Sequence, residues 1–206
     1  ALRVVLGACG PTHASAASYN NHWGVPLTLA RFPQSAKFGV FEIGMNHPGE
    51  ITPLVAMVKP HVAVITTIAP AHLEYMGSLE AIADAKAEIF SGVVQGGAAV
   101  LPRDVSTYDR LRKAAEASPV KHIVTFGEHE EADARLISCE PQGEGSKVSA
   151  IVLGEPQIYH LGAPGKRPVD LFIFELQPRD VPHDPRAEIV KPQGKQRVLR
   201  ALDPKE

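Results

Sequence analysis

The sequence predicts an α/β fold, in which a mostly parallel sheet is flanked by helices and continues into a small antiparallel β extension. Between residues 37 and 127, short apolar runs alternate with segments of helical periodicity, a pattern typical of a parallel sheet with helices on both faces. After Gly127 the pattern changes to alternating, strand-like segments separated by turns rich in Gly, Pro and Glu. The chain has 206 residues and 44% apolar residues, which is enough for a sizeable core.

The elements expected in the parallel part follow from these runs. We expect strands at residues 38–43, 61–68, 98–101 and 122–126, and helices at 51–58, 78–90 and 105–117. The β-branched run 61–68 predicts a strand buried on both faces. A further helix is expected to begin near Val25, with Pro26 in its first turn. The antiparallel part is expected to contain strands at 134–139, 147–153 and 157–161.

Composition excludes several classes of protein. The formal net charge is −2, so no basic field indicates a nucleic-acid partner. The sequence contains no run of about 18 apolar residues, so no membrane-spanning helix is predicted. Cys9 and Cys139 lack CxxC spacing, which favours reduced thiols in a cytosolic protein. Residues 168–206 combine repeated prolines with mixed charge. We therefore expect one domain at residues 1–167, followed by an extended or disordered tail at 168–206.

A lysine in an apolar helical stripe is the first candidate for a functional residue. In the segment 78–90, Leu79, Ile82, Ala83, Ile89 and Phe90 are predicted to share one face, and Lys86 lies in the middle of that stripe. Asp84, Ala87 and Glu88 are expected on or beside the other face. A buried ammonium requires a partner, a lowered pKa or a chemical modification, although the side chain could also extend along the stripe to water.

Two further candidates lie at or just after the ends of two predicted strands. Glu42 lies near the end of the strand at 38–43, and His72 follows the strand at 61–68. Ligands of open parallel sheets bind at the carboxyl ends of the strands, so we expect Glu42, His72 and Lys86 to converge at one edge. A neutral lysine amine can add carbon dioxide to give a carbamate, an oxygen donor suited to Mg²⁺. Individually, Glu42 could instead accept hydrogen bonds from loop amides, and His72 could be an ordinary loop or core histidine.

Two adjacent asparagines form the other marked feature. Asn20 and Asn21 precede the helix expected near Val25. Their side chains could cap that helix, or they could present amides to a polar substrate. The sequence contains no GxxxxGK[ST] phosphate-binding loop, and residues 162–167 (GAPGKR) imitate only part of one.

These motifs together resemble the central domain of the Mur ligases. The resemblance rests on THASAASYNNHWGVPLTLARFP, FEIGMNHPGEI, VAVITTIAPAHLEYMGS and DAKAEIFSG, and it extends from about Val4 to Gly165. The stretch FEIGMNHPGEI is most similar to the type that adds D-Ala-D-Ala. The resemblance implies a fold like that of P-loop nucleoside triphosphatases, here without the P-loop.

The resemblance also implies an ADP-forming acid–amino-acid ligase of the bacterial cytoplasm, which makes peptidoglycan precursor. ATP would phosphorylate the carboxylate of UDP-N-acetylmuramoyl tripeptide, and D-Ala-D-Ala would attack the acyl phosphate. Carried over by motif, Glu42, His72 and carbamylated Lys86 correspond to Mg²⁺ ligands with catalytic roles, and Asn20 and Asn21 to substrate-binding residues.

The family pattern also includes domains on either side of this region. We therefore expect the chain to be a fragment that releases no phosphate alone, and the alternative is a non-catalytic binding module with the same fold. Another Mur ligase or a folylpolyglutamate-type ligase is a further alternative, because these enzymes share the central architecture.

Overall fold

The computed structural model describes residues 2–15, 19–70 and 73–161. The expected tail at 168–206 therefore lies outside the described residues, as does His72. The helices are α1 (Leu2–Gly7), α2 (Gly24–Ala30), α3 (Ile51–Val58), α4 (Leu73–Met76), α5 (Leu79–Ala87), the 3-10 helix η1 (Glu88–Gly92) and α6 (Tyr108–Glu116). The strands are β1 (Thr12–Ala14), β2 (Phe38–Val40), β3 (Val62–Val64), β4 (Ala98–Pro102), β5 (His122–Gly127), β6 (Ala134–Gln142), β7 (Gly145–Val152) and β8 (Glu155–Leu161).

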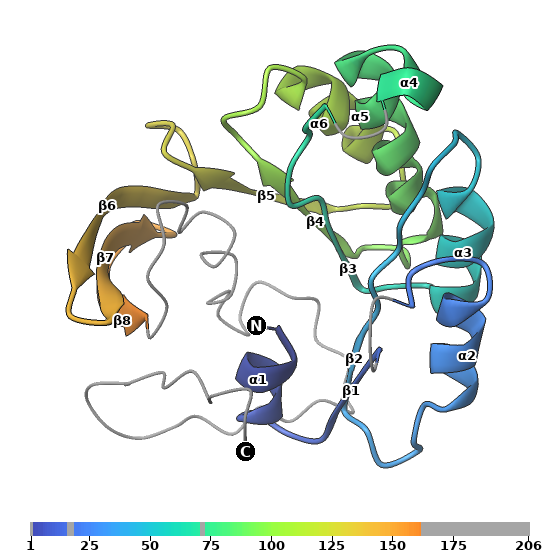
Figure 1. The fold of residues 1–206 in the computed structure, drawn as a ribbon, viewed down its shortest axis with the longest axis horizontal. Coiled ribbons are helices and arrows are strands. Elements are labelled where there is room, and N and C mark those ends of the chain that lie inside the picture. Colours follow the sequence, from blue (N-terminus) through green and yellow to red (C-terminus); the bar gives the residue numbers. More distant parts are fainter. Residues whose placement is uncertain (1, 16–18, 71–72, 162–206) are drawn as a thin grey trace.

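The strands form two sheets (Figure 1). The larger sheet has the order β3-β4-β5-β6-β7-β8, in which β3 to β6 pair in parallel and β6 to β8 pair antiparallel. Strands β1 and β2 form a separate parallel pair. The expected fold class, a mostly parallel sheet with helices and an antiparallel extension, is confirmed.

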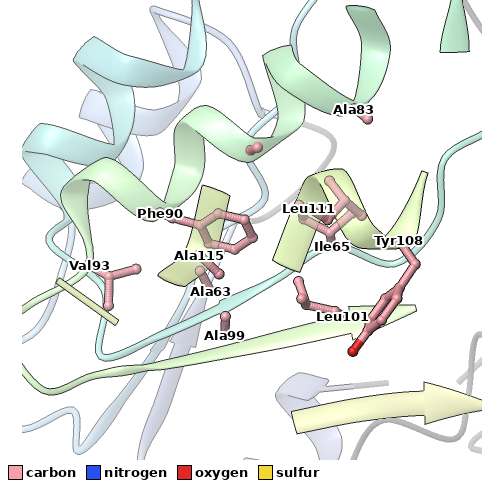
Figure 2. Close-up of a cluster of buried hydrophobic side chains, with 11 residues drawn as sticks. Ala63, Ile65, Ala83, Phe90, Val93, Ala99, Leu101, Tyr108, Leu111 and Ala115 are labelled. Carbon is pink, nitrogen blue, oxygen red and sulfur yellow. The ribbon is translucent and has the colours of Figure 1, made fainter. Parts of the chain in front are cut away.

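Strand β4 lies between two hydrophobic clusters. All five of its residues are buried, and alternate side chains point to opposite faces of the sheet. Ala99 and Leu101 pack beneath α5, η1 and α6, where Figure 2 shows Phe90 and Leu111 among the side chains that cover them. Val100 belongs to the second cluster, on the other face.

The second cluster differs from the expectation of helices on both faces. Its buried members all lie on strands, and they are Val100, Phe126, Ala134, Leu136, Val148 and Ala150. Within the described residues, this face of β4 is therefore packed against side chains of the antiparallel extension.

Strand β3 is shorter than the predicted strand at 61–68. Only Val62–Val64 pair with β4, and β3 has no second neighbour among the described residues of the sheet. Ala63 is buried, whereas Val62 and Val64 are only half-buried, because β3 lies at the end of the strand order. The prediction of a strand buried on both faces is therefore wrong here.

The predicted helix at 78–90 divides into α5 and η1. Ser78 begins α5, because its Oγ accepts a hydrogen bond from the Ala81 N–H at 3.1 Å. Ala87 is buried, contrary to the expectation that it lies beside the outer face, because it is four residues from buried Ala83 on the same helical face.

After α5 the chain continues as the 3-10 helix η1, which packs against α3. A Cβ built on Gly92 would lie 2.6 Å from the Val55 carbonyl oxygen, so this close packing requires glycine.

Candidate functional site

The carboxylate of Glu42 follows the carboxyl end of β2. It is exposed, and its Oε1 accepts a hydrogen bond from Asn20 Nδ2 at 2.8 Å. The Gly44 N–H also donates to the Asn20 carbonyl oxygen at 2.8 Å. A Cβ on Gly44 would lie 2.8 Å from Asn20 Nδ2, so the absence of a side chain at Gly44 leaves room for the Asn20 amide beside Glu42. Asn20 thus fixes one oxygen of Glu42.

Asn21 has a different role from Asn20. Its Oδ1 accepts hydrogen bonds from the backbone N–H groups of Trp23 and Gly24, at 3.1 and 3.0 Å. These bonds satisfy donors at the start of α2, which is the capping alternative that the sequence left open. Gly24 is required at this turn, because a Cβ there would lie 2.5 Å from the Tyr19 carbonyl carbon.

Lys86 projects from the last turn of α5 and is half-buried. Its Nζ donates a hydrogen bond to the backbone carbonyl oxygen of Thr67, at 2.8 Å. Thr67 lies in the segment that follows β3, so this bond ties α5 to the carboxyl end of that strand. Burial lowers the pKa of the Lys86 ammonium, because removing the charged form from water is costly.

His72, the third predicted metal ligand, lies outside the described residues. Helix α4 begins at the next residue, Leu73. The exposed side chain of Tyr75, on α4, packs edge-on against His47, with ring centroids 5.4 Å apart. His47 lies in the segment between Glu42 and α3. Contacts therefore connect the helix that follows His72 with the loop that follows Glu42.

The described residues bring the predicted groups together only in part. Asn20 contacts Glu42, and Lys86 contacts Thr67. Among the described residues, no three His, Cys, Asp or Glu side chains form a group that could hold a metal ion. His72 lies outside the described residues, and Lys86 is not one of these residue types, so the predicted metal-ligand roles of Glu42, His72 and Lys86 stay predictions.

The sequence reasoning missed Glu88. This residue was expected on or beside the outer face of its helix, but its carboxylate accepts hydrogen bonds from the Gly49 and Thr52 N–H groups and from the Thr52 hydroxyl. The partners are 36 to 39 residues apart along the chain, and no local pattern signals such a contact.

The fold and these groups define an α/β domain in which polar side chains follow the carboxyl ends of parallel strands, where open sheets bind ligands. None of the described helices has the length and apolar character needed to cross a membrane. Residues 2–170 match the Mur ligase middle domain, and the chain therefore belongs to the Mur ligase family.

Relatives of known type agree with this assignment. The UDP-N-acetylmuramoyl-tripeptide–D-alanyl-D-alanine ligase of Rickettsia prowazekii is 35% identical over 144 residues, which cover 70% of this chain and 32% of that protein. A crystal structure of MurF from Acinetobacter baumannii superposes with a TM-score of 0.76 and 27% identity, over 87% of this chain and 40% of that one. MurF ligase from Thermotoga maritima, in complex with ADP, has the same fold, with a TM-score of 0.74 and 22% identity, over 84% of this chain and 39% of that one.

The chain spans about a third of the length of the curated Rickettsia relative and two fifths of the Acinetobacter structure. The resemblance to Mur ligases of the D-Ala-D-Ala-adding type, inferred from the motifs, is confirmed by these relatives.

Proposed function

We propose that this chain supplies the magnesium-binding part of an ATP-dependent ligase. That ligase joins D-Ala-D-Ala to UDP-N-acetylmuramoyl tripeptide through an acyl phosphate, in the bacterial cytoplasm. The names of the relatives support the reaction class, and the ADP bound to the Thermotoga protein supports the use of ATP.

The observation that carries the proposal is the state of Lys86. Its amine is half-buried, it donates to one carbonyl oxygen, and burial lowers its pKa. A lowered pKa increases the neutral fraction of the amine at a given pH. The neutral Nζ lone pair can attack the carbon of carbon dioxide, forming an N–C bond and releasing one proton to water. The product is a carbamate whose two oxygens share one negative charge.

This donor set fits magnesium. The Lys86 carbamate and the Glu42 carboxylate offer the hard oxygen ligands that Mg²⁺ prefers, and His72 would add an imidazole nitrogen. Asn20 holds Glu42 through Oε1, while Oε2 accepts no hydrogen bond from the described residues. When bound, Mg²⁺ would neutralise charge on the transferred phosphoryl group.

We also propose that Asn20 and Asn21 face the muramoyl substrate. The exposed position of Asn21 beside the start of α2 supports this role. Because the Asn20 amide already contacts Glu42, substrate binding at Asn20 would link the substrate to a magnesium ligand.

The test is ¹³C NMR of the chain in ¹³C-bicarbonate, titrated with MgCl₂. We expect a carbamate resonance that grows with Mg²⁺, is absent in Lys86→Met and is weaker in Glu42→Gln and His72→Ala. Lys113→Met is the matched control, because Lys113 also lies in the last turn of a helix but its side chain is exposed. A wild-type spectrum without a Mg²⁺-dependent carbamate, or one that Lys86→Met leaves unchanged, would contradict the proposed site.

A further inference from the structure

The proposed ligands come from three separate segments of the chain. Glu42 follows β2, His72 precedes α4, and Lys86 lies on α5. Their relative positions therefore depend on contacts between these segments. The loop of residues 44–50, between Glu42 and α3, makes such contacts, and it is called the bracing loop below. The inference drawn from it rests on the proposed function.

Glu88 holds the end of the bracing loop. It is the first residue of η1, two residues after Lys86. Its Oε1 accepts from the Gly49 N–H at 2.5 Å, and its Oε2 accepts from the N–H and hydroxyl of Thr52, at 3.1 and 3.0 Å. The N-cap residue of α3 makes no side-chain capping bond, so Glu88 provides from another element the anionic acceptor that a helix N-terminus favours.

Two packing contacts hold the start of the bracing loop against the same helices. Met45 packs on a buried cluster formed by Met76, Ile82 and Ala85, which belong to α4 and α5. His47 packs edge-on against Tyr75 of α4. The loop is thus in contact with α4, α5 and η1 along its length.

The bracing loop is also constrained internally. The Glu50 carboxylate accepts from the Asn46 N–H at 2.7 Å and contacts His47 Nδ1 at 3.2 Å. Gly49 has a φ of +86°, which a residue with a side chain rarely adopts. Because these bonds leave the backbone of the bracing loop little conformational freedom, a displacement at one end of the loop also displaces the other end.

We propose that Glu88 is a positioning residue that sets the placement of Glu42 relative to Lys86 by anchoring the bracing loop to η1. A carboxylate is required at this position because all three of its partners are donors. An amide would direct its own N–H groups at one of them. Glu88 acts through the loop, because among the described residues its carboxylate bonds to Gly49 and Thr52 rather than to Glu42 or Lys86.

The experiment compares Glu88→Gln with the wild-type chain by NMR. The readouts are the Asn20 side-chain amide resonances, the Glu42 side-chain carboxyl resonance, and the Mg²⁺ concentration at half-maximal Lys86 carbamate. We expect shifts of the Asn20 and Glu42 resonances and an approximately tenfold higher Mg²⁺ midpoint, the lower end of what outer-shell partners contribute. Thr52→Val removes one of the three bonds and should give a smaller change in the same direction.

Glu116→Gln is the matched control, because Glu116 is an exposed carboxylate paired with Arg112 on α6. It should leave all three readouts at their wild-type values. Circular dichroism confirms that each variant is folded. A merely structural role for Glu88 would lower the melting temperature without moving the Asn20 and Glu42 resonances, and that result would overturn the inference.

Failure of this inference is distinguishable from failure of the proposed function. If the wild-type chain forms no carbamate, the proposed metal site is wrong, but the Asn20 and Glu42 resonances still decide whether Glu88 positions them. If carbamate forms and Glu88→Gln changes neither the resonances nor the Mg²⁺ midpoint, Glu88 is not a positioning residue.

Discussion

At the scale of single residues, the lowered pKa of Lys86 has a consequence for stability. In the unfolded chain a lysine has a pKa of about 10.4, whereas burial lowers the pKa of Lys86 in the folded chain. Between these two pKa values the unfolded chain binds more protons, so the free energy of unfolding rises with pH. The cost of burying the ammonium is thus present in full below the folded pKa, and it is relieved as the pH rises through that value.

We therefore predict that Lys86→Met changes the pH dependence of stability. Relative to the variant, the wild-type chain should gain stability as the pH rises through the folded-state pKa of Lys86 toward about 10.4, because only the wild type loses a half-buried charge in that window. Denaturant unfolding of both proteins at several pH values, in buffer purged of carbon dioxide, measures this difference. A difference in unfolding free energy that is constant with pH would show that the Lys86 pKa is ordinary in the folded chain.

Gly44 offers a test of how Glu42 is held. We predict that Gly44→Ala displaces the Asn20 side chain, because the added Cβ would lie 2.8 Å from its Nδ2. The clashing group is the end of a short side chain, so the cost in unfolding free energy should stay within about 1 kcal/mol. The Asn20 side-chain amide resonances should nevertheless move. Gly7→Ala, with nothing within 4 Å of its added Cβ and no positive φ, is the control for the glycine substitution itself.

At the scale of elements, α5 and α6 begin in different ways. Ser78 caps α5 through its hydroxyl, whereas Thr107 precedes α6 and its buried Oγ1 has no hydrogen-bond partner in the described part of the chain. We predict that Ser78→Ala costs about 1 kcal/mol of unfolding free energy. Thr107→Val should cost nothing or stabilise, because it removes a buried hydroxyl without a partner at similar volume.

Chemical denaturation of both variants measures this contrast between the two helix starts. Equal losses of stability in the two variants would contradict the assignment of a cap at Ser78 and of an unsatisfied hydroxyl at Thr107. Ser118→Ala is a poor control, since Ser118 Oγ donates a hydrogen bond to the Ala115 carbonyl oxygen of α6.

The elements themselves were largely predictable from the sequence, because hydrophobic periodicity is a local property. The strands at 98–101 and 122–126 and the helix at 51–58 lie within a residue of their predicted bounds. The length of β3 was not predictable, because it depends on whether a neighbouring strand pairs on each side.

The sequence predicted a chemistry for the candidate site, which stays a prediction, but it did not predict the contacts of the site residues. The position of Lys86 in an apolar stripe predicted a buried lysine, and the structure places it half-buried. The bonds of Asn20 to Glu42 and of Glu88 to Gly49 and Thr52 join residues 22 to 39 positions apart. Such bonds form when distant segments of the chain pack together, so no local sequence pattern predicts them.

At the scale of the whole molecule, β4 links the parallel part to the antiparallel extension. Leu101 packs into the cluster beneath α5 and α6, and Val100, its neighbour, packs into the cluster shared with β6 and β7. The two clusters are therefore built on opposite faces of one strand. Loss of either cluster removes half of the packing around β4, so we expect the described domain to unfold as one cooperative unit.

This expectation predicts matched behaviour of two distant variants. Leu101→Ala should cost about 3 kcal/mol and Val148→Ala about 2 kcal/mol of unfolding free energy, since both side chains are fully buried. Under native conditions, either variant should accelerate hydrogen exchange of the slowest amides in α6 and in β7 by the same factor, because a single global opening exposes both. If Val148→Ala accelerated exchange in β6 to β8 alone, the extension would open independently, and β4 would not couple the two clusters.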